Sequence, residues 1–207
     1  MNNQLVYRGI ARFYDVLDHT YFRNKVRSPR TAVLKFIKDS DQTVLDICTG
    51  TGANALEIAR CREITQVYGI DRSRNMLLMA NEKRSIEKLH NVEFKEMDAT
   101  NIEFKDGTFD VALLSLVLHE TQTELASKII KEAKRVLKDS GMLIVVEWEQ
   151  PKSLFQRICF LPIRLCEPQG FHEFLHRDMQ EYFEQYGLQV LDKVSCNYSK
   201  VLVIKKR

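Results

Sequence analysis

An acid, a glycine-rich turn and a second acid follow one another along the first 71 residues of this sequence. Asp46 lies in the apolar run TVLDI, and the turn CTGTG (48–52) separates that run from a segment with helical periodicity. Asp71 closes the next apolar run, VYGID. Glycines between a strand and a helix let the backbone approach a ligand closely, and an ionised carboxylate accepts hydrogen bonds from hydroxyl groups. The pattern predicts a nucleotide-type ligand beside this turn.

The residues around the glycines narrow the class of nucleotide. A phosphate-binding P-loop is excluded, because no Gly-Lys-Ser/Thr follows the turn. A dinucleotide site requires Gly-x-Gly-x-x-Gly, and Ala55 stands at the third position, as a variant of that motif permits. NAD therefore stays open as an alternative ligand, with an oxidoreductase as the corresponding function.

A histidine with acid–base potential follows the long apolar run FDVALLSLVL (109–118). His119 would lie at the carboxyl end of a strand, where doubly wound sheets bind their ligands. Among side chains, histidine has the pKa best suited to removing a proton near neutral pH, so His119 is our candidate catalytic base. The alternative is that it caps the following helix or packs beneath a covering segment.

The stretch HEFLH (172–176) matches the zinc-protease motif His-Glu-x-x-His, in which two histidines on one helix face bind the metal. A third ligand is also required. No histidine follows, and the sequence offers no well-separated helical glutamate downstream. We therefore expect no metal site, and we interpret the stretch as an amphipathic helix with Phe171, Phe174 and Leu175 facing inward.

Apolar runs of strand length alternate with helical patterns through most of the chain. This alternation predicts an α/β fold with a doubly wound, mostly parallel sheet covered on both faces. The last two strands have no helix between them, so they should form an antiparallel hairpin at the sheet edge. The predicted strands span 43–48, 67–71, 92–98, 109–118, 142–148, 188–194 and 200–205.

Helices are predicted from apolar periodicity and capping residues. An amphipathic helix over 5–22 would form an N-terminal helical lid, and a second should run from Ser28-Pro29 to about Ile37. The pattern Thr121-x-x-Glu124 predicts a capping box, and the helix it starts should bury Leu125 and Leu137 before Gly141 ends it. We expect an irregular insert over 149–170. A continuous helix should then run to Tyr186, with Gly187 as its C-cap.

Composition indicates one intracellular domain. The 207 residues are 44% hydrophobic, which suits a single core, and no apolar run approaches the roughly 18 residues of a membrane span. The first residues lack a signal-peptide pattern, and the five cysteines are scattered without a Cys-x-x-Cys pair, so we expect a cytoplasmic protein with reduced thiols. The leading segment 1–40 is basic, with eight Lys and Arg residues against three Asp and Glu residues.

The glycine-rich turn and the segments around it resemble those of the class I S-adenosylmethionine-dependent methyltransferases. Asp46-x-Cys48-x-Gly50-x-Gly52 is similar to the family's Asp-x-Gly-x-Gly-x-Gly, with cysteine in place of the first glycine. FDVALLSLVLH and EAKRVLKDSGMLIVVE resemble its fourth strand and its helix–glycine–fifth-strand passage. The resemblance covers about residues 40–150. The leading segment ARFYDVLDHTYFRNK is similar to ubiquinone/menaquinone-biosynthesis-like and phospholipid N-methyltransferase-like members.

The resemblance implies a seven-stranded Rossmann-like sheet and a set of residues for S-adenosylmethionine. By analogy, Asp71 would accept hydrogen bonds from the ribose hydroxyls, and Asp98-Ala99 would contact the adenine. Ser115 and Leu116 would lie near the methionine part. The complete predicted cofactor set is Tyr14, Asp46, Cys48, Thr49, Gly50, Gly52, Asp71, Arg72, Met76, Asp98, Ala99, Ser115 and Leu116.

We expect one methyltransferase domain over 1–207, made of an N-terminal helical cap (1–40), a cofactor-binding core (41–148) and an acceptor-side lid with edge strands (149–207). The acceptor would be a small molecule such as a quinol or a phospholipid; a nucleic acid is not expected. The apolar, basic segment 151–166 is open to three interpretations: a lid over a lipophilic acceptor, a peripheral membrane contact, or packing on the sheet edge. A non-catalytic, cofactor-binding partner subunit remains an alternative function.

Overall fold

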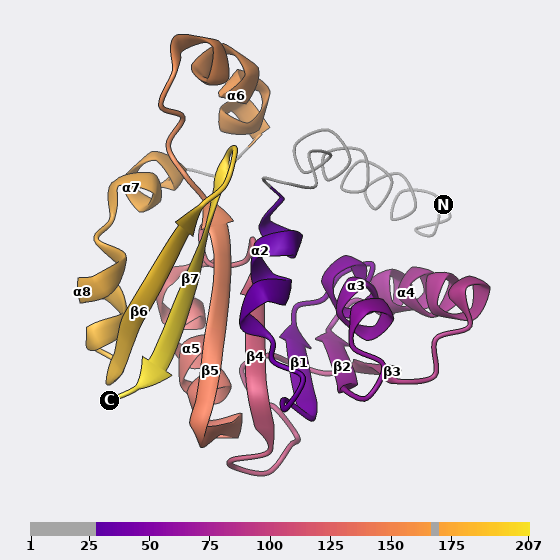
Figure 1. Ribbon diagram of the computed structural model, residues 1–207. Coiled ribbons are helices and arrows are strands. Elements are labelled where there is room, and N and C mark those ends of the chain that lie inside the picture. The colour runs from indigo at the N-terminus through magenta and orange to yellow at the C-terminus, as the bar shows by residue number, and fades with distance from the viewer. Residues whose placement is uncertain (1–27, 167–169) are drawn as a thin grey trace.

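The structure is a computed structural model that describes residues 28–166 and 170–207, and it contains a seven-stranded sheet (Figure 1). The strand order is β3-β2-β1-β4-β5-β7-β6. Strands β1 to β5 pair with one another in parallel, whereas β7 is antiparallel to both β5 and β6. The strands are β1 (Thr43–Ile47), β2 (Gln66–Asp71), β3 (Val92–Glu96), β4 (Phe109–Ser115), β5 (Leu137–Trp148), β6 (Leu188–Ser195) and β7 (Ser199–Lys206).

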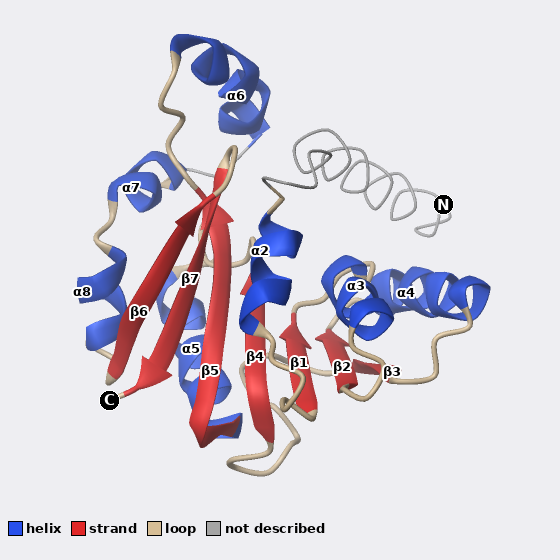
Figure 2. Cartoon of the chain, viewed as in Figure 1, coloured by secondary structure: helices blue, strands red, loops and turns tan. Residues whose placement is uncertain are grey.

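Helices follow β1, β2 and β4 and cover both faces of the sheet, whereas a loop connects β3 to β4 (Figure 2). The seven described helices are α2 (Pro29–Phe36), α3 (Ala53–Cys61), α4 (Arg74–Glu87), α5 (Thr123–Val136), α6 (Leu154–Cys166), α7 (Phe171–His176) and α8 (Met179–Glu184). The predicted helix over 5–22 and Tyr14 lie outside the described residues. No helix within 28–166 or 170–207 has the length and hydropathy needed to cross a bilayer.

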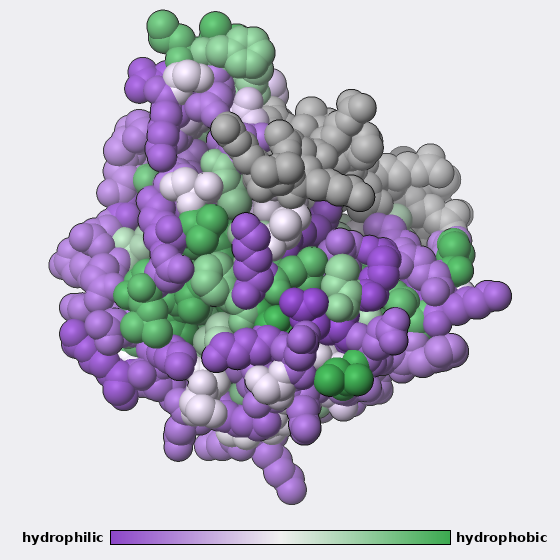
Figure 3. Space-filling model, viewed as in Figure 1, coloured by the Kyte–Doolittle hydropathy of each residue, from purple (hydrophilic) through white to green (hydrophobic). Residues whose placement is uncertain are grey.

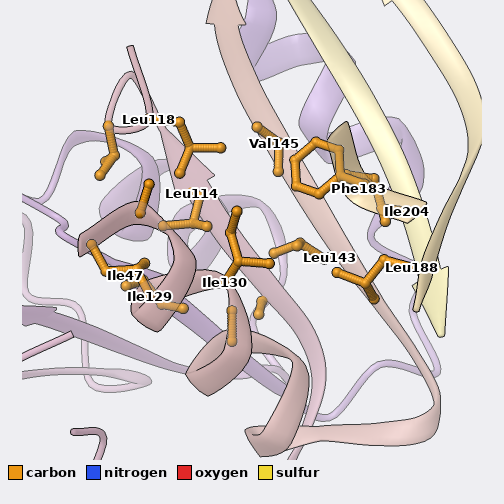
Figure 4. Close-up of a cluster of buried hydrophobic side chains, with 14 of the residues drawn as sticks. Ile47, Leu114, Leu118, Ile129, Ile130, Leu143, Val145, Phe183, Leu188 and Ile204 are labelled. Carbon is orange, nitrogen blue, oxygen red and sulfur yellow. The ribbon is translucent and has the colours of Figure 1, made fainter. Parts of the chain in front are cut away.

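Two hydrophobic clusters lie on opposite faces of the sheet, because successive side chains along a strand alternate between the faces. One cluster joins α2 and α3 to the sheet, through residues such as Val44. The other joins α5, α7 and α8 to it, and Figure 4 shows Ile130 of α5 and Phe183 of α8 among strand residues of this cluster. The predicted doubly wound, mostly parallel sheet with an antiparallel edge is therefore confirmed.

Serine caps two helix starts, including the predicted start at Ser28-Pro29. Ser28 precedes α2 and its hydroxyl accepts a hydrogen bond from the amide of Arg30, while Pro29 occupies the first turn. Ser73 precedes α4 and accepts from the amide of Met76. Both caps satisfy backbone donors that would otherwise lack a partner at a helix start.

The predicted capping box at Thr121 is wrong. Helix α5 begins at Thr123 with Gln122 as its N-cap, and the Thr121 hydroxyl donates instead to the carbonyl of Val117. The predicted helix end is also wrong, because α5 stops at Val136 and Leu137 already belongs to β5. Leu125 is not buried, since 41% of its surface is exposed.

Gly141 lies inside β5 rather than between a helix and a strand. A Cβ at this position would lie 3.0 Å from the carbonyl oxygens of Phe109, Asp110 and Lys138, where the register between β4 and β5 shifts. The absence of a side chain at Gly141 therefore lets the backbones of β4 and β5 approach closely at this bulge. Glycine within a strand often marks such a position.

The segment after β5 is more regular than predicted. Residues 154–166 form the continuous helix α6, with Pro162 inside it. The predicted continuous helix ending at Tyr186 is instead divided into α7 and α8, because Asp178 caps a new helix by accepting from the amides of Gln180 and Glu181. Phe160 of α6 lies beside Trp148 at the end of β5, and Phe171 of α7 lies beside His119, which follows β4.

Candidate functional site

The turn after β1 contains three residues with left-handed backbone conformation. Cys48, Gly50 and Gly52 have φ angles of 58°, 57° and 79°. Thr49 anchors the turn, because its amide donates a 2.9 Å hydrogen bond to the carbonyl of Ile70 in β2. The cysteine that replaces the first glycine of the motif thus occupies a conformation that costs an L-residue roughly 1–2 kcal/mol.

The two glycines of the turn are required for different reasons. A Cβ at Gly52 would lie 2.7 Å from Cζ of Phe94 and 2.9 Å from Cβ of Ala80, so this glycine permits close packing within the protein. A Cβ at Gly50 would meet nothing within 4 Å. The open space beside Gly50 leaves the backbone accessible to a ligand.

Asp46 stabilises the turn from its buried side. Its side chain is buried, and the hydroxyl of Thr49 donates to its Oδ2 at 2.5 Å. Burial raises the pKa of Asp46 from 3.8 to about 7, although hydrogen bonds from Thr49 and from the backbone of Ala55 oppose this rise. The carboxyl group therefore changes its charge close to neutral pH.

Asp71 connects the glycine turn to the start of α4. Its Oδ2 accepts a 2.9 Å hydrogen bond from the amide of Gly50, and its Oδ1 accepts a 2.8 Å hydrogen bond from the amide of Ser73. Each carboxylate oxygen has a second lone pair, and the residue is only partly buried. Asp71 can therefore hold the turn and still accept a pair of hydroxyl groups.

The electrostatic field at the turn is negative. Burial raises the pKa of the Cys48 thiol to about 12, and the carboxylates of Asp71, Asp46, Glu120 and Asp98 add to this rise in that order. A surrounding set of carboxylates favours a cationic ligand group and disfavours an anionic one. The field therefore suits a ligand with sulfonium and ammonium charges better than one with a pyrophosphate.

Of the remaining predicted residues, Met76 is half-buried in the first turn of α4, and the others follow the carboxyl ends of neighbouring strands. Asp98 follows β3 and is exposed, and two hydrogen bonds from Thr100, from its amide and its hydroxyl, lower the pKa of its carboxyl group. Ala99 is half-buried after it. Arg72 is exposed directly after β2, and its positive charge also lowers the pKa of Asp98.

The end of β4 bends sharply at Leu116. Ser115 is the last strand residue and is half-buried, and Leu116 adopts a left-handed conformation with φ 58° while its amide donates to the carbonyl of Val146. A bulky residue in this conformation is uncommon, and such residues cluster at ligand sites. The bend directs the chain across the end of β5, toward His119.

His119 is buried and paired with Glu147, the penultimate residue of β5. Its Nδ1 lies 2.6 Å from Oε2 of Glu147, and both side chains are almost completely inaccessible. The other carboxylate oxygen accepts hydrogen bonds of 3.1 and 2.7 Å from the amides of Val117 and Leu118. An ionised Glu147 therefore fixes the proton on Nδ1, which leaves Nε2 as the basic nitrogen of the imidazole.

Aromatic rings surround the imidazole of His119. Its centroid lies 5.5 Å from that of Phe171, 6.3 Å from that of Phe174 and 6.4 Å from that of Trp148. The histidine therefore packs beneath α7, and its role as a base stays a prediction. Burial strengthens its interaction with Glu147, because the effective dielectric constant is lower than in water.

The structure links four of the predicted cofactor residues by hydrogen bonds and adds Glu147, which was not predicted. Asp46, Thr49, Gly50 and Asp71 are connected through the turn by hydrogen bonds. Sequence reasoning missed Glu147, although an acid inside the apolar run MLIVVEW was a usable signal, because a buried carboxylate requires a partner.

The histidines of HEFLH lie on α7. Their rings are 4.4 Å apart, and Nδ1 of His176 lies 2.7 Å from the carbonyl oxygen of His172. Within the part of the chain that the structure describes, no group of three His, Cys, Asp or Glu side chains is placed to hold a metal ion. Phe171, Phe174 and Leu175 of this helix are buried, as expected for an amphipathic helix.

Comparison with known proteins agrees with this geometry. Residues 44–141 match the family model of a methyltransferase domain. A demethylmenaquinone methyltransferase of Staphylococcus saprophyticus is 31% identical over 157 residues, which cover 75% of this chain and 66% of that protein. One of Porphyromonas gingivalis is also 31% identical, over 72% of this chain and 62% of the relative. The chain thus spans just under two thirds of the length of these relatives.

A solved structure has the same fold. The S-adenosylmethionine-dependent methyltransferase of Aquifex aeolicus superposes with a TM-score of 0.68 at 21% identity, covering 99% of this chain and 98% of that one.

Proposed function

The chain belongs to the class I S-adenosylmethionine-dependent methyltransferases, and we propose that its methyl acceptor is a small lipophilic molecule of the demethylmenaquinone kind. The buried pair His119–Glu147 at the carboxyl ends of β4 and β5 is the observation that carries the acceptor side of this proposal. The shared name of the relatives in Staphylococcus saprophyticus and Porphyromonas gingivalis supports the choice of acceptor.

The cofactor half of the site fits S-adenosylmethionine by the chemistry of its groups. Asp71 would accept hydrogen bonds from the two ribose hydroxyls, and the open backbone at Gly50 would receive the aminoacyl part. The carboxylates that surround Cys48 would favour the positive charges of the ligand. We keep the other predicted positions, including Asp98, as proposed contacts.

The bound cofactor supplies a methyl group attached to a positively charged sulfur. His119 would prepare the acceptor, which must be the reduced, dihydroxy form of the quinone. Removal of one hydroxyl proton by Nε2 makes the neighbouring ring carbon nucleophilic, because the phenolate charge is shared with that carbon. Glu147 would stabilise the resulting imidazolium and keep Nε2 oriented, which is the role of a buried carboxylate beside a catalytic histidine.

The aromatic surroundings of His119 support a lipophilic acceptor. The rings of Phe171, Phe174 and Trp148 are buried around the imidazole and make its surroundings apolar, which suits an apolar acceptor better than a charged one. Phe171 and Phe174 on the acceptor side come from 149–207, whereas His119, Glu147 and Trp148 come from the core 41–148 that also supplies the cofactor-side residues. We retain 41–148 and 149–207, with the cap 1–40, as proposed parts of one domain. Segment 1–40 lies partly outside the described residues.

Methyl transfer from radiolabelled S-adenosylmethionine to three acceptors tests this function. The acceptors are a short-chain demethylmenaquinone reduced with dithionite, the same compound left oxidised, and phosphatidylethanolamine. We expect label only in the reduced quinone, on a ring carbon. Label in phosphatidylethanolamine alone would overturn the proposed acceptor. No label in any acceptor, despite measured cofactor binding, would favour the non-catalytic partner subunit.

A further inference from the structure

Helix α6 presents an apolar stripe to solvent. Leu154, Ile158, Leu161 and Leu165 follow one another at steps of four, three and four residues, which places them on one helix face. Their exposed fractions are 79%, 64%, 48% and 83%, and Phe155 beside them is 74% exposed. Figure 3 shows hydrophobic atoms gathered at the end of the molecule where α6 lies.

The opposite face of α6 is firmly packed. Phe160 and Ile163 are 0% and 3% exposed and belong to a separate hydrophobic cluster at this end of the sheet. The ring of Phe160 lies 5.6 Å from that of Trp148 and stacks on Tyr198 at 6.0 Å between centroids. Because these contacts bury only one face, the helix is held in place with its other apolar face uncovered.

Basic side chains border this stripe. Lys152, Arg157 and Arg164 are exposed, and none of them forms an ion pair with a described residue. Lys152 and Arg157 also line a cavity of about 680 Å³.

More cations than acids line this cavity. Three further cations line it, namely Arg177, Lys193 and Lys200, against the carboxylates of Glu149 and Asp178. Glu149 is already paired with Lys193 at 2.7 Å. The surroundings of α6 therefore combine exposed apolar side chains with an excess of positive charge.

We propose that α6 docks this chain on the surface of an anionic lipid bilayer. The apolar stripe would enter the boundary between headgroups and acyl chains, and the bordering cations would contact lipid phosphates, as amphipathic helices do at membrane surfaces. With 13 residues the helix lies in the interface and does not span it. This inference goes beyond the proposed function, because docking requires neither cofactor nor acceptor.

An anionic bilayer explains both features of the surface. A protein partner would need acids placed around an apolar patch to match the positive charge of this surface. A second copy of this chain would bring further positive charge to the interface, which is unfavourable. A bilayer with phosphate headgroups offers an apolar layer and a negative surface at matching depths. Charge complementarity therefore selects the bilayer among these occupants.

Vesicle flotation with the full chain, without cofactor or quinone, tests the proposal. The vesicles contain phosphatidylcholine alone or phosphatidylcholine with phosphatidylglycerol. We expect the unchanged chain to bind the anionic vesicles. Ile158→Asp and Leu161→Asp should each partition at least about tenfold more weakly, because each replaces an apolar side chain that lipid would bury with a charged one. The double variant Arg157→Glu/Arg164→Glu should lose binding to the anionic vesicles as well.

Ile86→Asp is the matched control, because Ile86 is 74% exposed but lies on α4. It should leave partitioning within about twofold of the unchanged chain, as expected for a residue outside the lipid contact. Circular dichroism verifies that each variant is folded. The proposal is overturned if the unchanged chain does not float with anionic vesicles, or if the α6 variants float as well as Ile86→Asp. Sedimentation showing a dimer that Ile158→Asp dissociates, without vesicle binding, would assign the stripe to a second copy.

Discussion

Nδ1 of His119 and Oε2 of Glu147 lie 2.6 Å apart and join the carboxyl ends of β4 and β5 in the buried interior of the chain. The same glutamate accepts hydrogen bonds from the amides of Val117 and Leu118, which hold its carboxylate in place. A carboxylate with this many donors is a fixed acceptor, so it determines which imidazole nitrogen carries the proton. The proposed base is therefore oriented by a residue that the acceptor need not touch.

Glu147→Gln should lower methyl transfer by at least about 10²-fold while the chain stays folded, the range for loss of a positioned base. The amide oxygen can still accept from Val117 and Leu118, but the amide nitrogen then donates to Nδ1 and forces the proton onto Nε2. Turnover and cofactor affinity are measured in parallel. A variant with full turnover would contradict the proposed tautomer.

His119→Ala should lower turnover by a similar factor, about 10²-fold or more, and leave cofactor affinity nearly constant, because the imidazole acts on the acceptor. Calorimetry with S-adenosylhomocysteine provides the affinity. Loss of cofactor binding would instead place His119 in the cofactor half of the site.

The contrast between β4 and β5 shows where sequence reasoning succeeds. The apolar runs of β1, β2 and β4 predict a buried parallel sheet, because only that arrangement covers both faces of such strands. The start of β5 at Leu137 was not predictable from the capping and breaking residues. The helical periodicity of α5 continues across its boundary, and only the close backbone approach at Gly141 reveals a strand there.

In the candidate site, too, one part could be predicted from the sequence and another part could not. The turn at Gly50 and the acid Asp71 follow from residue types and their order, because the motif is local in sequence. The pairing of His119 with Glu147 joins residues 28 positions apart in sequence and depends on the register of β4 against β5, which periodicity does not specify. A single acid in an apolar strand indicates a partner without identifying it.

Asp71→Ala should weaken S-adenosylhomocysteine binding by about 2–4 kcal/mol, because two hydrogen bonds to a charged acceptor are lost. The same change removes the acceptor for the amides of Gly50 and Ser73. Urea unfolding of the variant therefore accompanies the calorimetry. Unchanged affinity in a folded variant would show that other residues hold the ribose.

Gly50→Ala and Gly52→Ala form a matched pair, because both glycines are left-handed and only Gly52 lacks space for a Cβ. Gly50→Ala should cost roughly 1 kcal/mol of unfolding free energy, and it should weaken cofactor binding strongly. Gly52→Ala should cost a further 1–3 kcal/mol or so through overlap with Phe94. Equal loss of stability in both variants would contradict the assigned roles of the two positions.

Burial of Asp46 predicts a pH-dependent stability. Its pKa rises from 3.8 to about 7 on folding, so the folded chain holds a proton that the unfolded chain releases between these values. The free energy of unfolding should therefore fall as pH rises, by about 2–3 kcal/mol between roughly pH 5 and pH 8. Asp46→Asn should remove this fall, and an Asn variant with the same pH slope would show that other groups cause it.

Isothermal titration calorimetry with S-adenosylhomocysteine and with NAD is the most direct test of the account, because the two ligands separate a methyltransferase site from a dinucleotide site. The negative field around Cys48 and the paired acceptors of Asp71 predict that S-adenosylhomocysteine binds with a dissociation constant in the micromolar range or below, about −8 kcal/mol, and that NAD does not bind. Tight binding of NAD together with no heat from S-adenosylhomocysteine would contradict the account.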